Sequence, residues 1–314
     1  MRKLLWLALF VAAGFQGAFA QGLLQQQFGS GANAFTMDFV TIGNPGNAPD
    51  TTGNPNPAGA VSYIYSIGRY EVSRDMVNKA NSAGSLGITM YDMTLSGGNW
   101  PNKPATGISW IEAAKFVNYL NTSSGSVMAY KFDGGGNFQL WSSTDAGYNP
   151  GNAYRNSLAK YFLPSTDEWY KAAYGSPTGQ WSDYSNGLNT PPDITTGGGA
   201  GAVYGANMSG PADIADAGGM SPWGTIGQGG NVWEALESAW DQTNNSPNEM
   251  REYRGGSWSN INPEVYLSSS ATASGNITIG YETDGFRVAT SIPEPSSLSL
   301  LVLGGMVVAL KRRK

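Results

Sequence analysis

A chain that combines many glycines with many aromatic rings is typical of a compact domain built mainly from loops. Glycine fills 43 of the 314 positions, about twice its usual share of roughly 7%. The chain also contains 10 Trp, 16 Tyr and 11 Phe residues, which supply the apolar surface that disordered chains lack. We therefore predict a globular domain whose irregular backbone is held in place by buried rings.

The absence of cysteine and histidine excludes several kinds of chemistry. Without them there is no thiol nucleophile, no thiolate metal site and no imidazole base for a Ser-His-Asp triad. The net charge is −5, and no basic stripe crosses the middle of the chain. Nucleic acid is therefore not an expected partner.

The first 20 residues have the pattern of a secretory signal peptide. Arg2 and Lys3 precede an apolar run from Leu4 to Ala13, and a small-x-small cleavage site ends at Ala20. The apolar run is shorter than the roughly 20 residues that span a bilayer. Residues 1–20 are therefore interpreted as a cleaved signal peptide rather than as an uncleaved anchor.

The C-terminus carries a second targeting pattern. Pro293-Glu294-Pro295 precedes an apolar run from Leu298 to Leu310 and a basic tip, Lys311–Lys314. The three parts resemble the PEP-CTERM sorting signal of bacteria with two membranes, and this resemblance implies an exosortase-type processing enzyme as a partner. An ordinary single-span anchor would export the body in the same way, with the basic tip on the cytoplasmic side. We assign 292–314 as a sorting segment that contacts the membrane.

The body between these ends is predicted to be one domain, 35–291, because no linker or repeat divides it. A Gln- and Gly-rich segment, 21–34, is expected to be a flexible lead-in. Two capping boxes predict helices, one after Ser109 and one after Ser165, and a short helix is predicted near 73–82. Alternating or β-branched residues predict strands over the segments 34–43, 61–73, 253–258 and 284–290.

Five motifs follow one another through the body, each of them weak by itself. They are GRYEVSRDMV (68–77), ISWIEAAKFVNYLN (108–121), YFLPSTDEWYKAAY (161–174), GGNVWEAL (229–236), and YRGGSW with GFRVA (253–258 and 285–289). In this order they resemble the formylglycine-generating-enzyme family, also called sulfatase-modifying-factor domains. The resemblance implies an α+β, loop-rich, C-type-lectin-like fold with little regular secondary structure.

The resemblance also locates a pocket that lacks its metal ligands. In the oxidase members two cysteines after the G-G-S motif bind copper, and their places here fall at Asn260 and Val265, neither of which supplies a thiolate. Related sulfoxide synthases hold iron with histidines, which are absent. Copper and iron are therefore not expected. The pocket frame that the resemblance implies is Arg254, Ser257, Trp258, Asn260 and Arg287.

Most of these motif residues have a structural interpretation as well as a functional one. Arg254 and Arg287 are expected to pair with buried carboxylates such as Glu168 or Glu234. Ser257 matches the serine of the family motif, but no base stands near it by any recognisable pattern. The motifs are therefore expected to hold the fold rather than to react.

One calcium site of the family is expected to be weak or absent here. Gly230, Val232 and Glu234 match its ligand positions, but Gly227 stands where the family has a side-chain ligand. A hard cation requires several oxygen ligands, so the loss of one weakens the site.

A second calcium site implied by the resemblance has a full set of candidates. Asn207, Met208 and either Asp213 or Asp216 fit its ligand pattern. The same residue types also form turns, and the sequence leaves the two interpretations open.

The sequence favours a non-catalytic, exported protein at the cell surface, in the outer membrane or in the extracellular matrix. Its role is expected to be binding or structural. The Trp and Tyr residues offer a sugar-stacking surface for a glycan or extracellular polymer as one interpretation, while core packing is the expected role of most of these rings. The alternative is a formylglycine-generating-type oxidase or another metal-dependent oxidoreductase acting on exported proteins. A glycoside hydrolase using Asp167 and Glu168 is disfavoured, because adjacent carboxylates do not form the opposed pair that hydrolysis needs.

Overall fold

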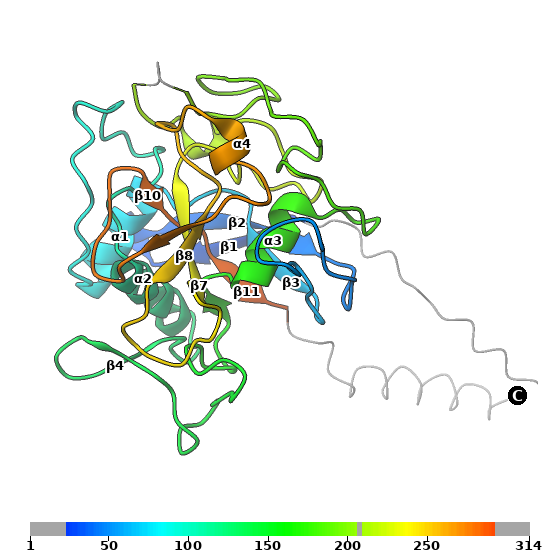
Figure 1. The fold of residues 1–314 in the computed structure, drawn as a ribbon. Coiled ribbons are helices and arrows are strands. Elements are labelled where there is room, and N and C mark those ends of the chain that lie inside the picture. Colours follow the sequence, from blue (N-terminus) through cyan, green and yellow to red (C-terminus); the bar gives the residue numbers. More distant parts are fainter. Residues whose placement is uncertain (1–22, 206–208, 293–314) are drawn as a thin grey trace, which may run out of the picture.

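The computed structural model describes residues 23–205 and 209–292 (Figure 1). The expected signal peptide, the sorting segment from Pro293 onward, Asn207 and Met208 lie outside these residues. Within the two described ranges, no helix is long and apolar enough to cross a membrane. Short helices and short strands alternate with long loops, as expected for a loop-rich α+β fold.

A five-stranded sheet brings the two ends of the described chain together. The strand order is β1-β2-β3-β11-β6, so the last strand lies between two strands from earlier in the chain. Every pairing in this sheet is antiparallel. The strands are β1 (Leu23–Phe28), β2 (Phe35–Ile42), β3 (Tyr65–Gly68), β6 (Tyr161–Phe162) and β11 (Ala289–Ser291).

A four-stranded sheet, with the order β10-β7-β8-β9, and a two-stranded sheet complete the strands of the described part. β10 pairs with β7 in parallel, whereas the other pairs are antiparallel. The strands are β4 (Lys131–Phe132), β5 (Phe138–Gln139), β7 (Trp233–Ala239), β8 (Arg251–Arg254), β9 (Ala273–Gly275) and β10 (Asp284–Gly285).

The helices begin where the sequence places caps. Ser109 and Glu112 form a complete capping box before α2, and Ser165 and Glu168 form another before α3, so both predicted helices are confirmed. Ser73 caps α1, because its side chain accepts a hydrogen bond from the backbone of Met76. The helices are α1 (Arg74–Gly84), α2 (Trp110–Ser123), α3 (Thr166–Tyr174) and α4 (Pro263–Tyr266), with 3₁₀ turns η1 (Gly31–Asn33) and η2 (Ile214–Asp216).

The core lies on both faces of β2. Phe35 and Phe39 belong to a large apolar cluster that includes the buried face of α2. Val40 and Ile42 belong to a second cluster that contains Ala172 of α3. Because successive strand residues point to opposite faces, α2 and α3 cover opposite sides of the five-stranded sheet.

Four expectations about local structure differ from the fold. The strand expected over 61–73 is limited to β3, Tyr65–Gly68. The segment 21–34, expected to be a flexible lead-in, contains β1, which pairs with β2 through backbone groups that glutamine side chains do not disturb, while Phe28 is buried. The strand expected over 253–258 ends at Arg254, because Gly255 and Gly256 adopt φ values of +97° and +73°. The strand expected over 284–290 is divided between the two sheets as β10 and β11.

Candidate functional site

The two arginines of the pocket frame implied by the motifs are buried and already have partners in the protein. Arg287 is fully buried, and its Nε and Nη2 each donate to the Glu234 carboxylate at 2.5 Å. Trp169 Nε1 donates to the same carboxylate at 2.6 Å. The expected pairing of Arg287 with Glu234 is therefore present, and both Glu234 oxygens are engaged.

Arg254 has a different partner from those expected. Its Nε donates to Glu252 Oε1 at 2.7 Å, within the same strand. Its Nη2 donates to the carbonyl oxygen of Asn54, and Nη1 reaches the carbonyls of Ser269 and Ala271 at 3.3 Å. Arg254 thus ties two loops to β8 and leaves no nitrogen for a ligand.

The segment after the double glycine forms a closed turn. Asn260 Oδ1 accepts hydrogen bonds from the Ser257 backbone at 2.7 Å and from Ser257 Oγ at 3.1 Å. Ser257 Oγ also lies 3.1 Å from Ser259 Oγ, and among the described residues it contacts no basic group. Val265, at the second thiolate position, lies on α4 and is 54% exposed. The turn presents hydroxyl and amide groups only.

Trp258 packs inward beside this turn. It is 9% exposed and belongs to a cluster with Met93, Val203, Ala212 and Val232. The side chain of Val232, one of the expected calcium positions, is therefore held by apolar packing. The ligand expected at this position is its backbone carbonyl, which this packing does not involve.

The first expected calcium position has no free carboxylate oxygen on Glu234, because Arg287 and Trp169 occupy both. The backbone nitrogen of Gly230 donates to the carbonyl of Gly255 at 2.8 Å. This donor set does not fit a calcium ion unless the ion pair of Glu234 opens.

Glu71 is an acidic group at this position that motif reasoning missed as a candidate ligand. A Cβ at Gly227 would lie 3.2 Å from the Glu71 carboxyl carbon. Oε2 accepts from Asn231 Nδ2 at 2.6 Å, and Oε1 has no partner within the described chain. Burial raises the pKa of Glu71, the charge of Glu234 raises it further, and Arg287 opposes both. The signal in the sequence was the acid of the E-V-S motif.

The second expected calcium position is only partly described. Asp213 precedes η2 and Asp216 is its last residue, and both line a cavity of about 400 Å³ together with Lys103. Lys103 Nζ lies 3.4 Å from Asp213 Oδ1, so an ammonium group already neutralises this side of the cavity. Across 23–205 and 209–292, no group of three or more acidic side chains is arranged to hold a metal ion. Asn207 and Met208 lie outside those ranges.

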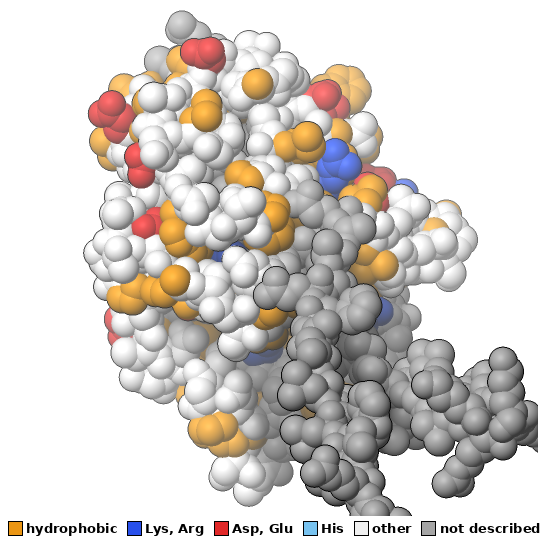
Figure 2. Space-filling view, turned by 90° about the vertical axis from the view of Figure 1, so that its right-hand side faces the viewer, with side chains coloured by type: hydrophobic (Ala, Val, Ile, Leu, Met, Phe, Trp, Pro, Cys, Tyr) orange, Lys and Arg blue, Asp and Glu red, His pale blue; other side chains and the backbone are white. Residues whose placement is uncertain are grey.

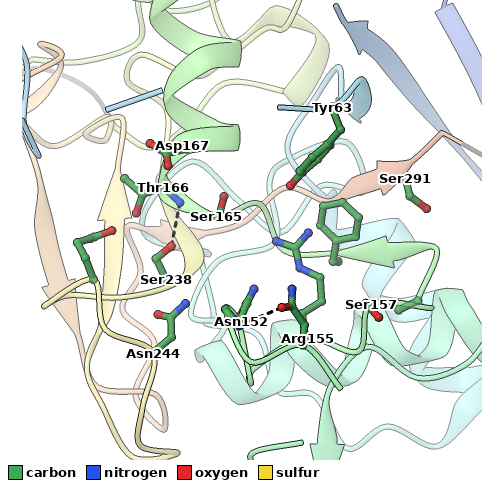
Figure 3. A pocket seen from close by; sticks show the side chains of 15 residues that line it. Tyr63, Asn152, Arg155, Ser157, Ser165, Thr166, Asp167, Ser238, Asn244 and Ser291 are labelled. Carbon is green, nitrogen blue, oxygen red and sulfur yellow. Dashed lines mark hydrogen bonds between the residues drawn. The ribbon is translucent and has the colours of Figure 1, made fainter. Parts of the chain in front are cut away.

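A larger cavity, of about 480 Å³, lies at the start of α3 (Figure 3). We call it the Arg155 cavity. Figure 3 shows Arg155 entering it from the loop after β5, with Ser165, Thr166 and Asp167 of the α3 start on the opposite wall. Ser238 at the end of β7 and Ser291 at the end of β11 complete the wall. The two sheets and α3 therefore all contribute to this cavity.

Arg155 is the cation of a buried charge network beneath the cavity. Its Nε donates to both oxygens of Glu237 at 2.9 Å, and its Nη1 and Nη2 donate to the Glu168 carboxylate at 3.0 and 2.9 Å. The guanidinium lies 3.7 Å above the ring of Phe162. Tyr63 donates its hydroxyl proton to Glu168 at 2.5 Å. Every nitrogen of the guanidinium is thus used within the protein.

The network fixes the charges of its members. Burial alone would raise the pKa of Glu168, but the ion pair with Arg155 outweighs burial and the pKa is lowered. Burial opposes the charge of Arg155, yet Glu168 and Glu237 raise its pKa well above the usual value. Burial raises the pKa of Asp167, which lies beside the network. Two carboxylates around one cation leave the cavity floor with a negative excess.

Motif reasoning did not find Arg155, because it lies in a loop with no recognisable pattern. The available signal was indirect. Glu168 was expected to be a buried carboxylate, and buried carboxylates require a cation. Sequence alone does not show which of several arginines supplies it.

Two family models match the chain. The model described as "Sulfatase-modifying factor enzyme 1-like domain" matches residues 42–292. The PEP-CTERM protein-sorting motif matches residues 291–314. This motif implies recognition by an exosortase, export, and association with the cell envelope of Gram-negative bacteria. No curated protein matches the chain.

Three solved structures share the fold. "Crystal Structure of CarF" describes a chain 20% identical to this one, with a TM-score of 0.60, covering 82% of this chain and 98% of that one. "Treponema denticola variable protein 1" is 20% identical with a TM-score of 0.58, covering 86% and 99%. PvdO from Pseudomonas aeruginosa is 15% identical with a TM-score of 0.52, covering 85% and 98%.

These neighbours confirm the expected α+β, C-type-lectin-like fold with little regular secondary structure. At identities of 15–20%, these structures are evidence for the fold and not for the function. The family model covers most of the residues, and the chain therefore belongs to the formylglycine-generating-enzyme family, that of the sulfatase-modifying factor enzyme 1-like domain.

Proposed function

We propose that this protein is an exported binding module that has no oxidase activity. The observation that carries the proposal is the turn at Ser257–Asn260. An amide closes it where the oxidase members have a thiolate, and the second thiolate position is an exposed valine on α4. Copper(I) requires soft sulfur ligands, which this turn does not offer.

The surrounding residues support a scaffold role for the family pocket. Arg254, Glu234 and Arg287 are fully buried. Arg287 is paired with Glu234 and Arg254 with Glu252, so none of them is left free for a substrate. Removing one partner of a buried ion pair destabilises a protein by about 3–5 kcal/mol. A contribution to stability is therefore sufficient to explain these residues. Copper and iron have no place in this proposal, and calcium is proposed only as a weak structural ligand.

The test is a metal and activity measurement on the protein purified from the envelope or medium of an expressing host. We expect no stoichiometric copper or iron by mass spectrometry, and no oxygen consumption when a cysteine-containing peptide is added. Stoichiometric copper or iron together with peptide-dependent oxygen uptake would establish the oxidase alternative instead. Calcium binding, measured in the same preparation, leaves the proposal standing because calcium supplies no redox chemistry.

The final location is a further part of the proposal. The sorting motif implies export and envelope association, and we propose that the protein resides at the cell surface, in the outer membrane or in the secreted polymer matrix, held through its C-terminal segment until processing. Fractionation of cells with and without the exosortase tests this point. Retention in the inner membrane of exosortase-deficient cells is expected, and an unchanged distribution would contradict it.

A further inference from the structure

The Arg155 cavity has the size and lining of a small-ligand site. The 161–174 motif contributes Ser165, Thr166 and Asp167 to its wall, but neither the expected copper positions nor the pocket frame around Arg254 and Arg287 includes it. Its volume of about 480 Å³ falls within the range of roughly 300–1,000 Å³ typical of ligand pockets. Its lining is dominated by neutral hydroxyl and amide side chains. They are Asn149, Asn152, Ser157, Ser165, Thr166, Ser238, Gln242, Asn244 and Ser291.

Several of these side chains are fixed by one hydrogen bond and keep another group available. Ser238 Oγ accepts from the Thr166 backbone at 3.0 Å, and its own hydroxyl proton has no partner among the described residues. Asn244 Oδ1 accepts from the Ala239 backbone at 2.7 Å, which leaves the amide protons of Asn244 without a partner in the same set. Groups that are already oriented lose little entropy when they bind a ligand.

The charge of the cavity disfavours an anionic ligand. Arg155 is the cation at its floor, and each of its nitrogens already donates to Glu168 or Glu237. Asp167 adds a further acidic group to the wall. Figure 2 shows few charged side chains among the described residues on the face of the molecule that it draws. A phosphate, sulfate or uronate would therefore meet net repulsion without a free cation.

A cationic ligand is also a poorer match than a neutral one. Asp167 is the one carboxylate in the wall, and its Oδ1 already accepts from the Gly59 backbone at 2.7 Å. The remaining polar groups are hydroxyls and amides, which both donate and accept hydrogen bonds. A ligand that carries several hydroxyl groups uses this mixture fully, whereas an ammonium group only donates.

Tyr63 contributes a partly exposed aromatic ring to the lining of the cavity. Tyr63 is 43% exposed, while its hydroxyl is held by Glu168 at 2.5 Å and its ring packs edge-on against Tyr65. The ring is therefore held by a hydrogen bond and a ring contact and is partly open to solvent. Such a ring offers an apolar face to the C–H side of a sugar.

We propose that the Arg155 cavity binds a neutral sugar residue of an extracellular polysaccharide, with Tyr63 against the sugar ring and Ser238 and Asn244 bonded to its hydroxyls. The inference rests on the proposed binding function and adds the site and the ligand class. It assigns no chemistry to the family pocket.

The experiment is a glycan array followed by titration calorimetry on the full-length protein, with neutral, uronate-containing and amine-bearing oligosaccharides as probes. We expect binding to neutral glycans only. Tyr63→Ala and Asn244→Asp are each expected to weaken binding about ten-fold, which corresponds to the loss of one good contact. Tyr63→Phe keeps the ring and is expected to retain most of the affinity.

The matched control is Trp100→Ala. Trp100 is 67% exposed and lines a different cavity together with Thr94 and Asn99. It is expected to leave binding unchanged, and thermal unfolding shows that each variant is folded. Binding that Trp100→Ala abolishes, or that survives both cavity variants, overturns the inference. Binding only to uronates or amines, or to no glycan, also overturns it. Each of these outcomes leaves the proposed function intact, because that function fails only through oxygen consumption with bound copper or iron.

Discussion

Arg155 bridges two buried carboxylates, those of Glu168 and Glu237. Its removal is expected to lower the free energy of unfolding. In Arg155→Met, Glu168 and Glu237 would face each other without a cation, so we expect a loss of about 3–5 kcal/mol in the free energy of unfolding at neutral pH. Urea denaturation measures it. The control is Lys79→Met, which removes only an exposed i,i+4 ion pair with Asp75 and is expected to change stability by less than about 1 kcal/mol.

The pH dependence of the same variant follows from the lowered pKa of Glu168. In the native protein, Glu168 stabilises the fold above the ordinary glutamate pKa, and this contribution is lost as the pH falls through the lowered value. In Arg155→Met the unpaired carboxylates favour protonation. The difference in the free energy of unfolding between the variant and the native protein is therefore expected to shrink on acidification. A difference that widens would contradict the role given to this charge network.

Arg251 is a buried cation held by rings rather than by a carboxylate. Its guanidinium carbon lies 4.0 Å from the ring centre of Tyr154 and 4.4 Å from that of Trp110, and burial lowers its pKa. A lysine cannot stack in this way and is hydrated more strongly. We expect Arg251→Lys to destabilise the protein by about 2 kcal/mol or more, and Arg251→Met by less, as chemical denaturation would show. Equal stability of all three proteins would contradict this role.

The contribution of the α2 capping box to the stability of the protein can be tested by mutation. Ser109 Oγ accepts from the Glu112 backbone at 3.3 Å, and Glu112 Oε2 accepts from the Ser109 backbone at 2.9 Å. We expect Ser109→Ala to cost about 1 kcal/mol, as other caps do. Ser82→Ala on the exposed side of α1 is the control, and its change should stay within about 0.5 kcal/mol. Thermal unfolding of both variants decides the point.

Local signals in the sequence predicted some elements and not others for physical reasons. Caps are local, so Ser109 and Ser165 placed two helices correctly. β1 was missed because its pairing with β2 depends on backbone partners that composition does not reveal. The Arg155 cavity was missed because it is assembled from loops and element ends far apart in the chain. The motifs located the family pocket. They could not show that its arginines are already bonded to other groups of the protein.

At the scale of the whole molecule, β11 closes the fold. It lies between β3 and β6, and Ala289 belongs to the cluster on the α3 side of the sheet. A chain that ends at Val288 is expected to lose cooperative unfolding, because β3 and β6 would then have no shared neighbour. A chain that ends at Ile292 keeps β11 and should unfold as the full-length protein does. Circular dichroism during heating compares the two, and a folded shorter chain would contradict this role of β11.

The position of β11 also determines how the molecule would carry a mechanical load. The sorting segment follows directly after this strand, and Ser291 at its end lines the Arg155 cavity. If the protein is tethered by its C-terminus while the cavity holds a polymer, tension enters along β11, a strand with a neighbour on each side. The hydrogen bonds to β3 and β6 are then loaded together in shear rather than opened one after another. Force would pass between the tether and the polymer over a short path through the end of β11.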